Sequence, residues 1–178
     1  MLDIYTRNLY LVNGKENKSK DKVMSRTIII SNRLPIQIKL KNNKCEISSS
    51  IGGLATGLRS VHQAEHSLWL GWTGIANEDL NEDHYEKIEK ELTENHKCIP
   101  VFLSRDEIDQ FYHNFSNKTL WPLFHHFPML TDYNKTSWDG YQRVNRLFYN
   151  RLREFIQPDD RIWVQDYQLF LLPKMIKS

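Results

Sequence analysis

The feature that most constrains the fold is a set of short apolar runs that alternate with segments of helical periodicity. The runs lie at 26–31, 68–72, 98–103 and 162–164, and the first of them is rich in β-branched residues. They show no alternation of apolar and polar residues, which is typical of strands buried on both faces of a parallel sheet. The pattern therefore predicts an α/β fold with a Rossmann-like, doubly wound and mostly parallel sheet.

The segments between these runs carry recognisable helix and hairpin signals. An apolar stripe at 3.6-residue spacing predicts a helix over 138–156. Ser104 and Glu107 have the spacing of a capping box, which marks the start of another helix. The acidic segment 77–95 is expected to be a surface helix, and the segment 36–47 resembles a β-hairpin.

Residues 1–25 differ in composition from the rest of the chain. They contain the polar, lysine-rich stretch NGKENKSKDK, so we expect a flexible extension. Met24 stands directly before the first strand and is an alternative start of the protein. Residues 26–178 are expected to form one domain of ordinary size.

The composition excludes several classes of function. With 24 basic and 22 acidic residues, the net charge of +2 gives no electrostatic case for binding a nucleic acid or an acidic membrane. No run approaches the ~20 apolar residues that span a bilayer, and no cleavage site of a signal peptide follows the N-terminus. We therefore expect a cytoplasmic protein.

Cysteine and histidine usage gives no sign of a metal. Cys45 and Cys98 form neither a disulfide framework nor a CxxC pair. His125 and His126 are adjacent, but no carboxylate cluster lies beside them in the sequence. No metal site is expected.

Polar side chains follow the predicted strands at the ends where ligands of doubly wound sheets bind. Arg33 comes directly after the first strand, and its guanidinium can bind a phosphate with two hydrogen bonds or pair with a surface carboxylate. Asp166 follows the last strand, where a carboxylate can bind sugar hydroxyls, act as a base or cap the next helix. Trp72 is expected to end another strand.

Gly52 and Gly53 open an apolar segment with helical spacing. Glycines let the backbone approach a ligand closely, and a helix N-terminus offers free N–H groups and a partial positive charge. A phosphate or diphosphate is one ligand that such a segment can bind. A plain turn is the alternative, since the pattern is neither a P-loop nor GxGxxG.

The segment 111–124 mixes aromatic and polar side chains around Pro122 and fits neither a regular helix nor a strand. Sugar rings pack on aromatic planes, so an irregular aromatic segment with amide and hydroxyl groups is typical of a sugar-binding wall. Among the tryptophans, Trp138 and Trp163 are expected in the core.

Six ordered blocks resemble the N-terminal half of the trehalose-6-phosphate synthases, which are retaining glycosyltransferases of the GT-B architecture. The blocks are SNRLP at 31–35, GGLATGL at 52–58, WLGWTG at 69–74, FYHNFSN at 111–117 with LWPLFH at 120–125, WDGYQRVN at 138–145 and IWVQDYQL at 162–169. The resemblance covers residues 26–178, and this number of blocks in order is highly specific.

The resemblance implies transfer of glucose from UDP-glucose to glucose 6-phosphate with retention, giving trehalose 6-phosphate and UDP. It implies that Gly52 and Gly53 meet the diphosphate of the donor through backbone N–H groups. It implies no metal and no other cofactor, and it is compatible with a homo-oligomer of the full-length enzyme.

The resemblance also implies roles on the acceptor side. Arg33 would hold the phosphate of glucose 6-phosphate. Tyr112 and Trp121 would line the site of the acceptor glucose, with Trp72 nearby. Asp166 would bind acceptor hydroxyls close to the reacting centre and is the expected catalytic residue.

Two departures from the family pattern affect what this chain does. Gln165 and Gln168 stand where the family commonly has histidines, and glutamine does not titrate near neutrality. The sequence also stops at Ser178, before the donor-binding domain, so residues 1–178 alone are expected to be inactive. The alternatives are a non-catalytic sugar-phosphate-binding module, a truncated fragment, or a synthase with another acceptor such as glycerol phosphate.

Overall fold

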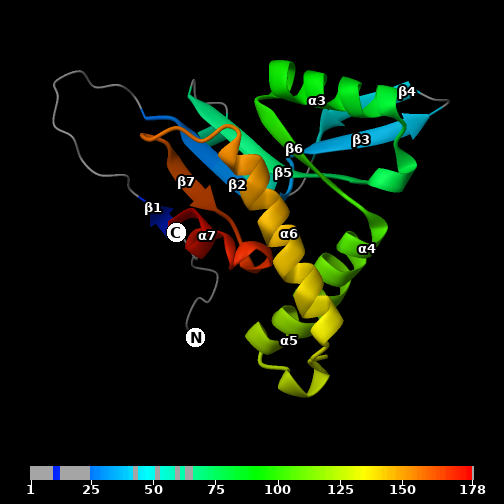
Figure 1. Cartoon of the computed structure of the whole chain (residues 1–178), viewed down its shortest axis with the longest axis vertical. Coiled ribbons are helices and arrows are strands. Elements are labelled where there is room, and N and C mark those ends of the chain that lie inside the picture. The colour runs from blue at the N-terminus through cyan, green and yellow to red at the C-terminus, as the bar shows by residue number, and fades with distance from the viewer. Residues whose placement is uncertain are drawn as a thin grey trace, which may run out of the picture.

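The computed structural model describes residues 10–12, 25–41, 44–50, 53–58, 61–62 and 66–177. A five-stranded sheet with strand order β1-β7-β2-β5-β6 forms its centre (Figure 1). The strands are β1 (Tyr10–Val12), β2 (Thr27–Arg33), β5 (Ser67–Ala76), β6 (Cys98–Leu103) and β7 (Arg161–Val164). All pairings between neighbours are parallel except that of β1 with β7. The predicted α/β class with a mostly parallel sheet is confirmed.

Strand β1 lies within the segment that the composition predicts to be a flexible extension. Tyr10 pairs with Val164, so for residues 10–12 the structure differs from the prediction. The apolar triplet Tyr-Leu-Val has a strand-forming composition, and it pairs with the edge of β7 that β2 leaves open. Residues 1–9 and 13–24 lie outside the described residues.

Helices cover one face of the sheet, and a helix with a hairpin covers the other (Figure 1). On the first face lie the π-helix η2, α6 and α7, and on the second lie α3 and the hairpin of β3 and β4. Their bounds are η2 (Ile108–Leu120), α6 (Lys135–Arg153), α7 (Leu172–Lys177), α3 (Glu82–His96), β3 (Ile36–Lys41) and β4 (Lys44–Ser49). The shorter helices are α1 (Gly53–Gly57), η1 (Asn77–Asp79), α4 (Arg105–Glu107), α5 (Trp121–Phe124), η3 (Pro128–Leu130) and η4 (Tyr167–Leu169).

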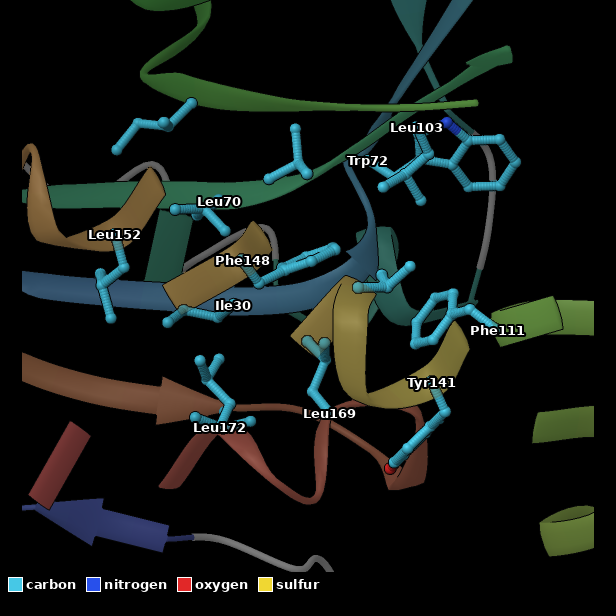
Figure 2. Close-up of a cluster of buried hydrophobic side chains, with 14 of the residues drawn as sticks. Ile30, Leu70, Trp72, Leu103, Phe111, Tyr141, Phe148, Leu152, Leu169 and Leu172 are labelled. Atoms are coloured by element: carbon cyan, nitrogen blue, oxygen red, sulfur yellow. The ribbon is translucent and has the colours of Figure 1, made fainter. Parts of the chain in front are cut away.

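Side chains of strand β2 belong to both hydrophobic cores of the domain, one on each face of the sheet. Ile28 and Ile30 join the larger core under α6, whereas Ile29 joins the core under α3, and all three are fully buried. Figure 2 shows the larger core, in which Ile30 and Phe148 lie between the sheet and α6. Burial of each such side chain is worth about 1.5–3 kcal/mol. The sequence prediction of strands buried on both faces is therefore confirmed.

The segment 111–124 is helical, and the prediction that it is irregular is wrong. The predicted capping box starts the helix, because Ser104 Oγ accepts a hydrogen bond from the N–H of Glu107 and the Glu107 carboxylate accepts one from the N–H of Ser104. The helix continues as η2, with a π-helical pattern. Pro122 does not interrupt it and lies in the first turn of α5.

Other boundaries differ in detail from the predictions. Helix α6 begins before residue 138, because the side chain of Asn134 caps it. Strand β5 continues to Ala76, so Trp72 lies inside the strand rather than at its end. Trp138 and Trp163 are half-buried, and of the two only Trp138 packs against the larger core. None of the described helices is long and apolar enough to cross a membrane.

Candidate functional site

A cavity of about 580 Å³ lies where β2 and β7 end. Of the residues predicted for the site, Arg33, Tyr112 and Asp166 line it. The other lining residues are Ser31, Asn32, Leu34, Pro35, Ile36, Gln37, Ser50, Trp69, Gln165 and Gln168. The carboxyl-terminal edge of the sheet thus brings together side chains that are far apart in the sequence, as expected of a doubly wound fold.

Arg33 supplies a positive charge at this cavity. Its guanidinium carbon lies 5.2 Å from the centre of the Trp72 ring, within range of a cation–π interaction. No described carboxylate forms an ion pair with it. Among the described residues, the pairing of Arg33 with a surface carboxylate is therefore not observed, and Arg33 is exposed to solvent.

The backbone turn that carries Arg33 is held by buried hydrogen bonds. The indole N–H of Trp69 donates to Ser31 Oγ at 2.7 Å, and this hydroxyl donates to the carbonyl of Arg33, also at 2.7 Å. The N–H of Leu34 donates to the carbonyl of Trp72 at 2.9 Å. Ser31 and Trp69 are each 1% exposed, so water does not compete for these bonds.

Ser31, Asn32 and Trp69 all line the cavity, although the resemblance implies no role for any of them. The carbonyl oxygen of the Asn32 side chain is buried and has no hydrogen-bond partner, an arrangement that is uncommon in folded proteins. The available signal was the position of these residues in the blocks SNRLP and WLGWTG, close to Arg33 and Trp72.

Asp166 lies in a strained backbone conformation. Its φ of 71° and ψ of 168° belong to a region that almost only glycine adopts. The N–H of Gln165 donates to the carbonyl of Ile30 at 2.7 Å, which ties this loop to β2. Strain of this kind costs about 1–3 kcal/mol and gathers at functional sites. The carboxylate also accepts a hydrogen bond from the N–H of Tyr167 at 2.8 Å, so it caps the short helix η4 as well as lining the cavity.

Two tyrosines lie near this carboxylate. Tyr112 reaches the cavity from η2, and Tyr167 follows Asp166 in the chain. Burial raises the pKa of Tyr167 to about 12, with smaller contributions in the same direction from Asp166 and Tyr112. The Tyr167 phenol is therefore a neutral hydroxyl at physiological pH, able to donate and accept hydrogen bonds.

The structure does not bring every predicted residue to the cavity. Trp72 is 7% exposed, packs in the larger core and lies next to Arg33, not in the cavity lining. Trp121 is 43% exposed and stacks on His125, with ring centres 4.1 Å apart. Gly53 begins α1 with open space around it, whereas Gly52 lies outside the described residues, so the diphosphate site stays a prediction.

The described residues contain no group of three or more His, Cys, Asp or Glu side chains placed to hold a metal ion. His125 Nδ1 lies 2.7 Å from the carbonyl of Trp121, within its own helical turn. The polar chemistry of the cavity consists of one guanidinium, one carboxylate, a phenol, hydroxyls and amides. Such a set can bind a phosphorylated compound with several hydroxyl groups.

Several known proteins are similar to this chain in sequence and in structure. An α,α-trehalose-phosphate synthase [UDP-forming] from Emericella nidulans is 38% identical over 166 residues, which are 93% of this chain and 32% of that protein. A structure of such a synthase from Burkholderia xenovorans in complex with glucose-6-phosphate superposes with a TM-score of 0.64 at 30% identity, over 86% of this chain and 30% of that one. A structure from E. coli bound with UDP-2-fluoro glucose gives the same values.

The chain thus spans about a third of the length of the Emericella relative. The profile described as glycosyltransferase family 20 matches residues 25–178, which is nearly the whole chain. The protein belongs to glycosyltransferase family 20.

Proposed function

We propose that residues 26–178 form the acceptor-side domain of a UDP-forming trehalose-phosphate synthase, and that the cavity binds glucose 6-phosphate. The observation that carries this proposal is the joint presence of Arg33, Asp166 and Tyr112 around one cavity. The similarity to a synthase structure in complex with glucose-6-phosphate supports it. As the whole reaction, we propose transfer of glucose from UDP-glucose to this acceptor, in the cytoplasm and without a metal or other cofactor.

The two charged residues of the site bind different ends of the acceptor. Arg33 binds the phosphate, because its planar fork matches two phosphate oxygens and no described carboxylate neutralises it. Asp166 accepts hydrogen bonds from sugar hydroxyls, and Tyr112 packs beside the ring. For Trp121, which does not line the cavity, contact with the acceptor sugar stays a prediction.

In the transfer itself, a new bond forms between the acceptor hydroxyl oxygen and the anomeric carbon of the donor glucose. The bond from that carbon to the diphosphate oxygen breaks, and UDP leaves with the electron pair. Retention requires attack on the face from which UDP departs, so the acceptor hydroxyl proton passes to the departing diphosphate oxygen on that face. Asp166 fixes the acceptor hydroxyls near this centre, while Gly52 and Gly53 donate backbone N–H groups to the diphosphate.

Calorimetry with glucose 6-phosphate tests the acceptor site. We expect wild-type protein to bind this ligand and Arg33→Ala to bind it at least about 10-fold more weakly, with unchanged affinity for glucose. A folded wild type that binds no glucose 6-phosphate at millimolar concentration contradicts the proposal. If glycerol 3-phosphate bound more tightly than glucose 6-phosphate, the proposed acceptor would be glycerol 3-phosphate.

Release of UDP from UDP-glucose plus glucose 6-phosphate tests the reaction. We expect turnover by the full-length protein and none by residues 1–178 alone. Turnover by residues 1–178 would contradict the assignment of donor binding to another domain. Binding without turnover in the full-length protein would favour the non-catalytic sugar-phosphate-binding module.

A further inference from the structure

A glycine of β5 lies against the side chain of Arg33. Gly74 has φ +88°, a value in the left-handed region that side chains rarely adopt. A Cβ atom built on Gly74 would lie 2.1 Å from Nη2 of Arg33 and 2.9 Å from Cζ. The guanidinium therefore occupies the volume that a side chain at position 74 would need.

The indole of Trp72 also contacts this guanidinium. The Trp72 ring centre lies 5.2 Å from the guanidinium carbon. This ring is fixed in turn, because its N–H donates to the carbonyl of Ile75 at 3.0 Å and the residue is 7% exposed. Arg33 is thus held by an aromatic face and a bare stretch of backbone, both supplied by β5.

The same strand fixes the backbone from which this side chain starts. The register of β2 and β5 shifts between Ile30 and Arg33, and after the shift Arg33 pairs with Trp72. A Cβ on Gly71 would lie 2.9 Å from the nitrogen of Leu34 and 3.0 Å from the carbonyl carbon of Arg33. Gly71 therefore permits the close approach of the backbone, whereas Gly74 permits the placement of the cation.

We propose that Gly74 is a positioning residue for Arg33: its missing side chain lets the guanidinium lie beside Trp72 at the cavity, preset for a phosphomonoester. A free arginine side chain has many rotamers, and ordering it on binding reduces affinity. Contact with Gly74 and Trp72 removes most of these rotamers before the ligand arrives. The inference rests on the proposed function, in which Arg33 binds the phosphate of the acceptor.

This arrangement predicts an effect on the phosphate end of the ligand alone. A side chain at position 74 displaces the guanidinium, while Asp166 and Tyr112 lie at other places in the cavity lining. Affinity for glucose 6-phosphate should therefore fall, and affinity for glucose should not.

The test is calorimetry with glucose 6-phosphate and with glucose on full-length protein carrying Gly74→Ala. We expect binding of glucose 6-phosphate to weaken at least about 10-fold, which corresponds to about 1.4 kcal/mol. Gly57→Ala is the matched control, because a Cβ there meets nothing within 4 Å. This control should bind within about twofold of wild type.

Two further variants separate displacement of Arg33 from a general loss of structure. Asparagine tolerates positive φ better than alanine, so Gly74→Asn should fold well yet bind glucose 6-phosphate as weakly as Gly74→Ala. In an Arg33→Ala background, Gly74→Ala should add less than about a twofold change, because both variants remove the same contact.

Three results would overturn the inference. The first is Gly74→Ala or Gly74→Asn binding glucose 6-phosphate within twofold of wild type. The second is an equal loss with and without Arg33, which would show that Gly74 acts on the whole fold. The third is a wild type that binds no glucose 6-phosphate, which alone would also overturn the proposed function.

Discussion

Two parts of the molecule carry predicted binding residues in very different surroundings. We define the sheet edge as Ser31–Leu34, Trp69–Gly74 and Gln165–Gln168. Buried hydrogen bonds and close contacts at glycines fix its backbone, which is strained at one residue. The aromatic segment, defined as Trp121–Tyr133, exposes its large apolar side chains, from 42% at Leu123 to 95% at Met129.

The difference shows which part of a binding site a single domain determines by itself. At the sheet edge, backbone geometry follows from contacts within the domain, so Arg33 and Asp166 meet around one cavity. In the aromatic segment, Trp121 contacts His125 from its own helical turn and does not line the cavity. Its place in a site therefore does not follow from the packing of the described residues.

The largest effect is expected from Asp166→Asn at the sheet edge. Asparagine has nearly the same shape and tolerates positive φ, so this variant removes the charge and little else. In full-length protein we expect kcat/KM for trehalose phosphate formation to fall about 10²-fold, because the acceptor hydroxyls lose their positioning, measured as UDP release. Asp159→Asn, an exposed position in the preceding loop, is the control and should keep wild-type activity. Equal activity of both variants would show that Asp166 has no role in the reaction.

Much of the sheet edge could be predicted because its residues follow strands that the sequence makes evident. The run Ile28–Ile30 is apolar throughout, so β2 is recognisable, and the position of Arg33 after it follows from chain order. Asp166 follows β7 in the same way. Parallel strands then bring both side chains to one edge, whatever their distance in sequence.

Other features depend on contacts that no local pattern contains. One of them is the packing of η2 on α6, in which Phe111 stacks on Tyr141. The buried position of Trp72 and its contact with Arg33 depend on the register shift between β2 and β5. Gly52–Gly53 carried a ligand prediction from sequence, whereas the glycines in contact with the Arg33 segment are Gly71 and Gly74.

A smaller effect, on stability, should distinguish the two regions directly. Gly71→Ala places a methyl group against the backbone of Arg33 and Leu34, and such overpacking costs about 1–3 kcal/mol in the free energy of unfolding. Leu130→Ser, at a side chain 68% exposed in the aromatic segment, should change it by less than about 0.5 kcal/mol. Urea unfolding of both variants measures the difference. A larger loss for Leu130→Ser would show that the aromatic segment packs more tightly than the sheet edge.

The smallest effect concerns the pH dependence of stability near the strained loop. The pKa of Tyr167 is raised to about 12, mainly by burial, from an ordinary value near 10. Between these two values the unfolded chain loses the phenol proton while the folded chain keeps it, so the stability present below pH 10 declines toward pH 12. Urea unfolding of wild type and Tyr167→Phe from pH 8 to about 12 measures this decline.

Tyr167→Phe should show a shallower decline than wild type above pH 10, by up to about one proton released on unfolding. A decline remains in the variant, because burial also raises the pKa of Tyr141 and raises the pKa of Cys98 to about 12. Tyr133→Phe, at a phenol 73% exposed in the aromatic segment, is the matched control and should follow the wild-type curve. If both variants gave the same curve, Tyr167 would be no more buried in solution than a tyrosine of the aromatic segment, and the contrast between the two regions would not extend to the Asp166 loop.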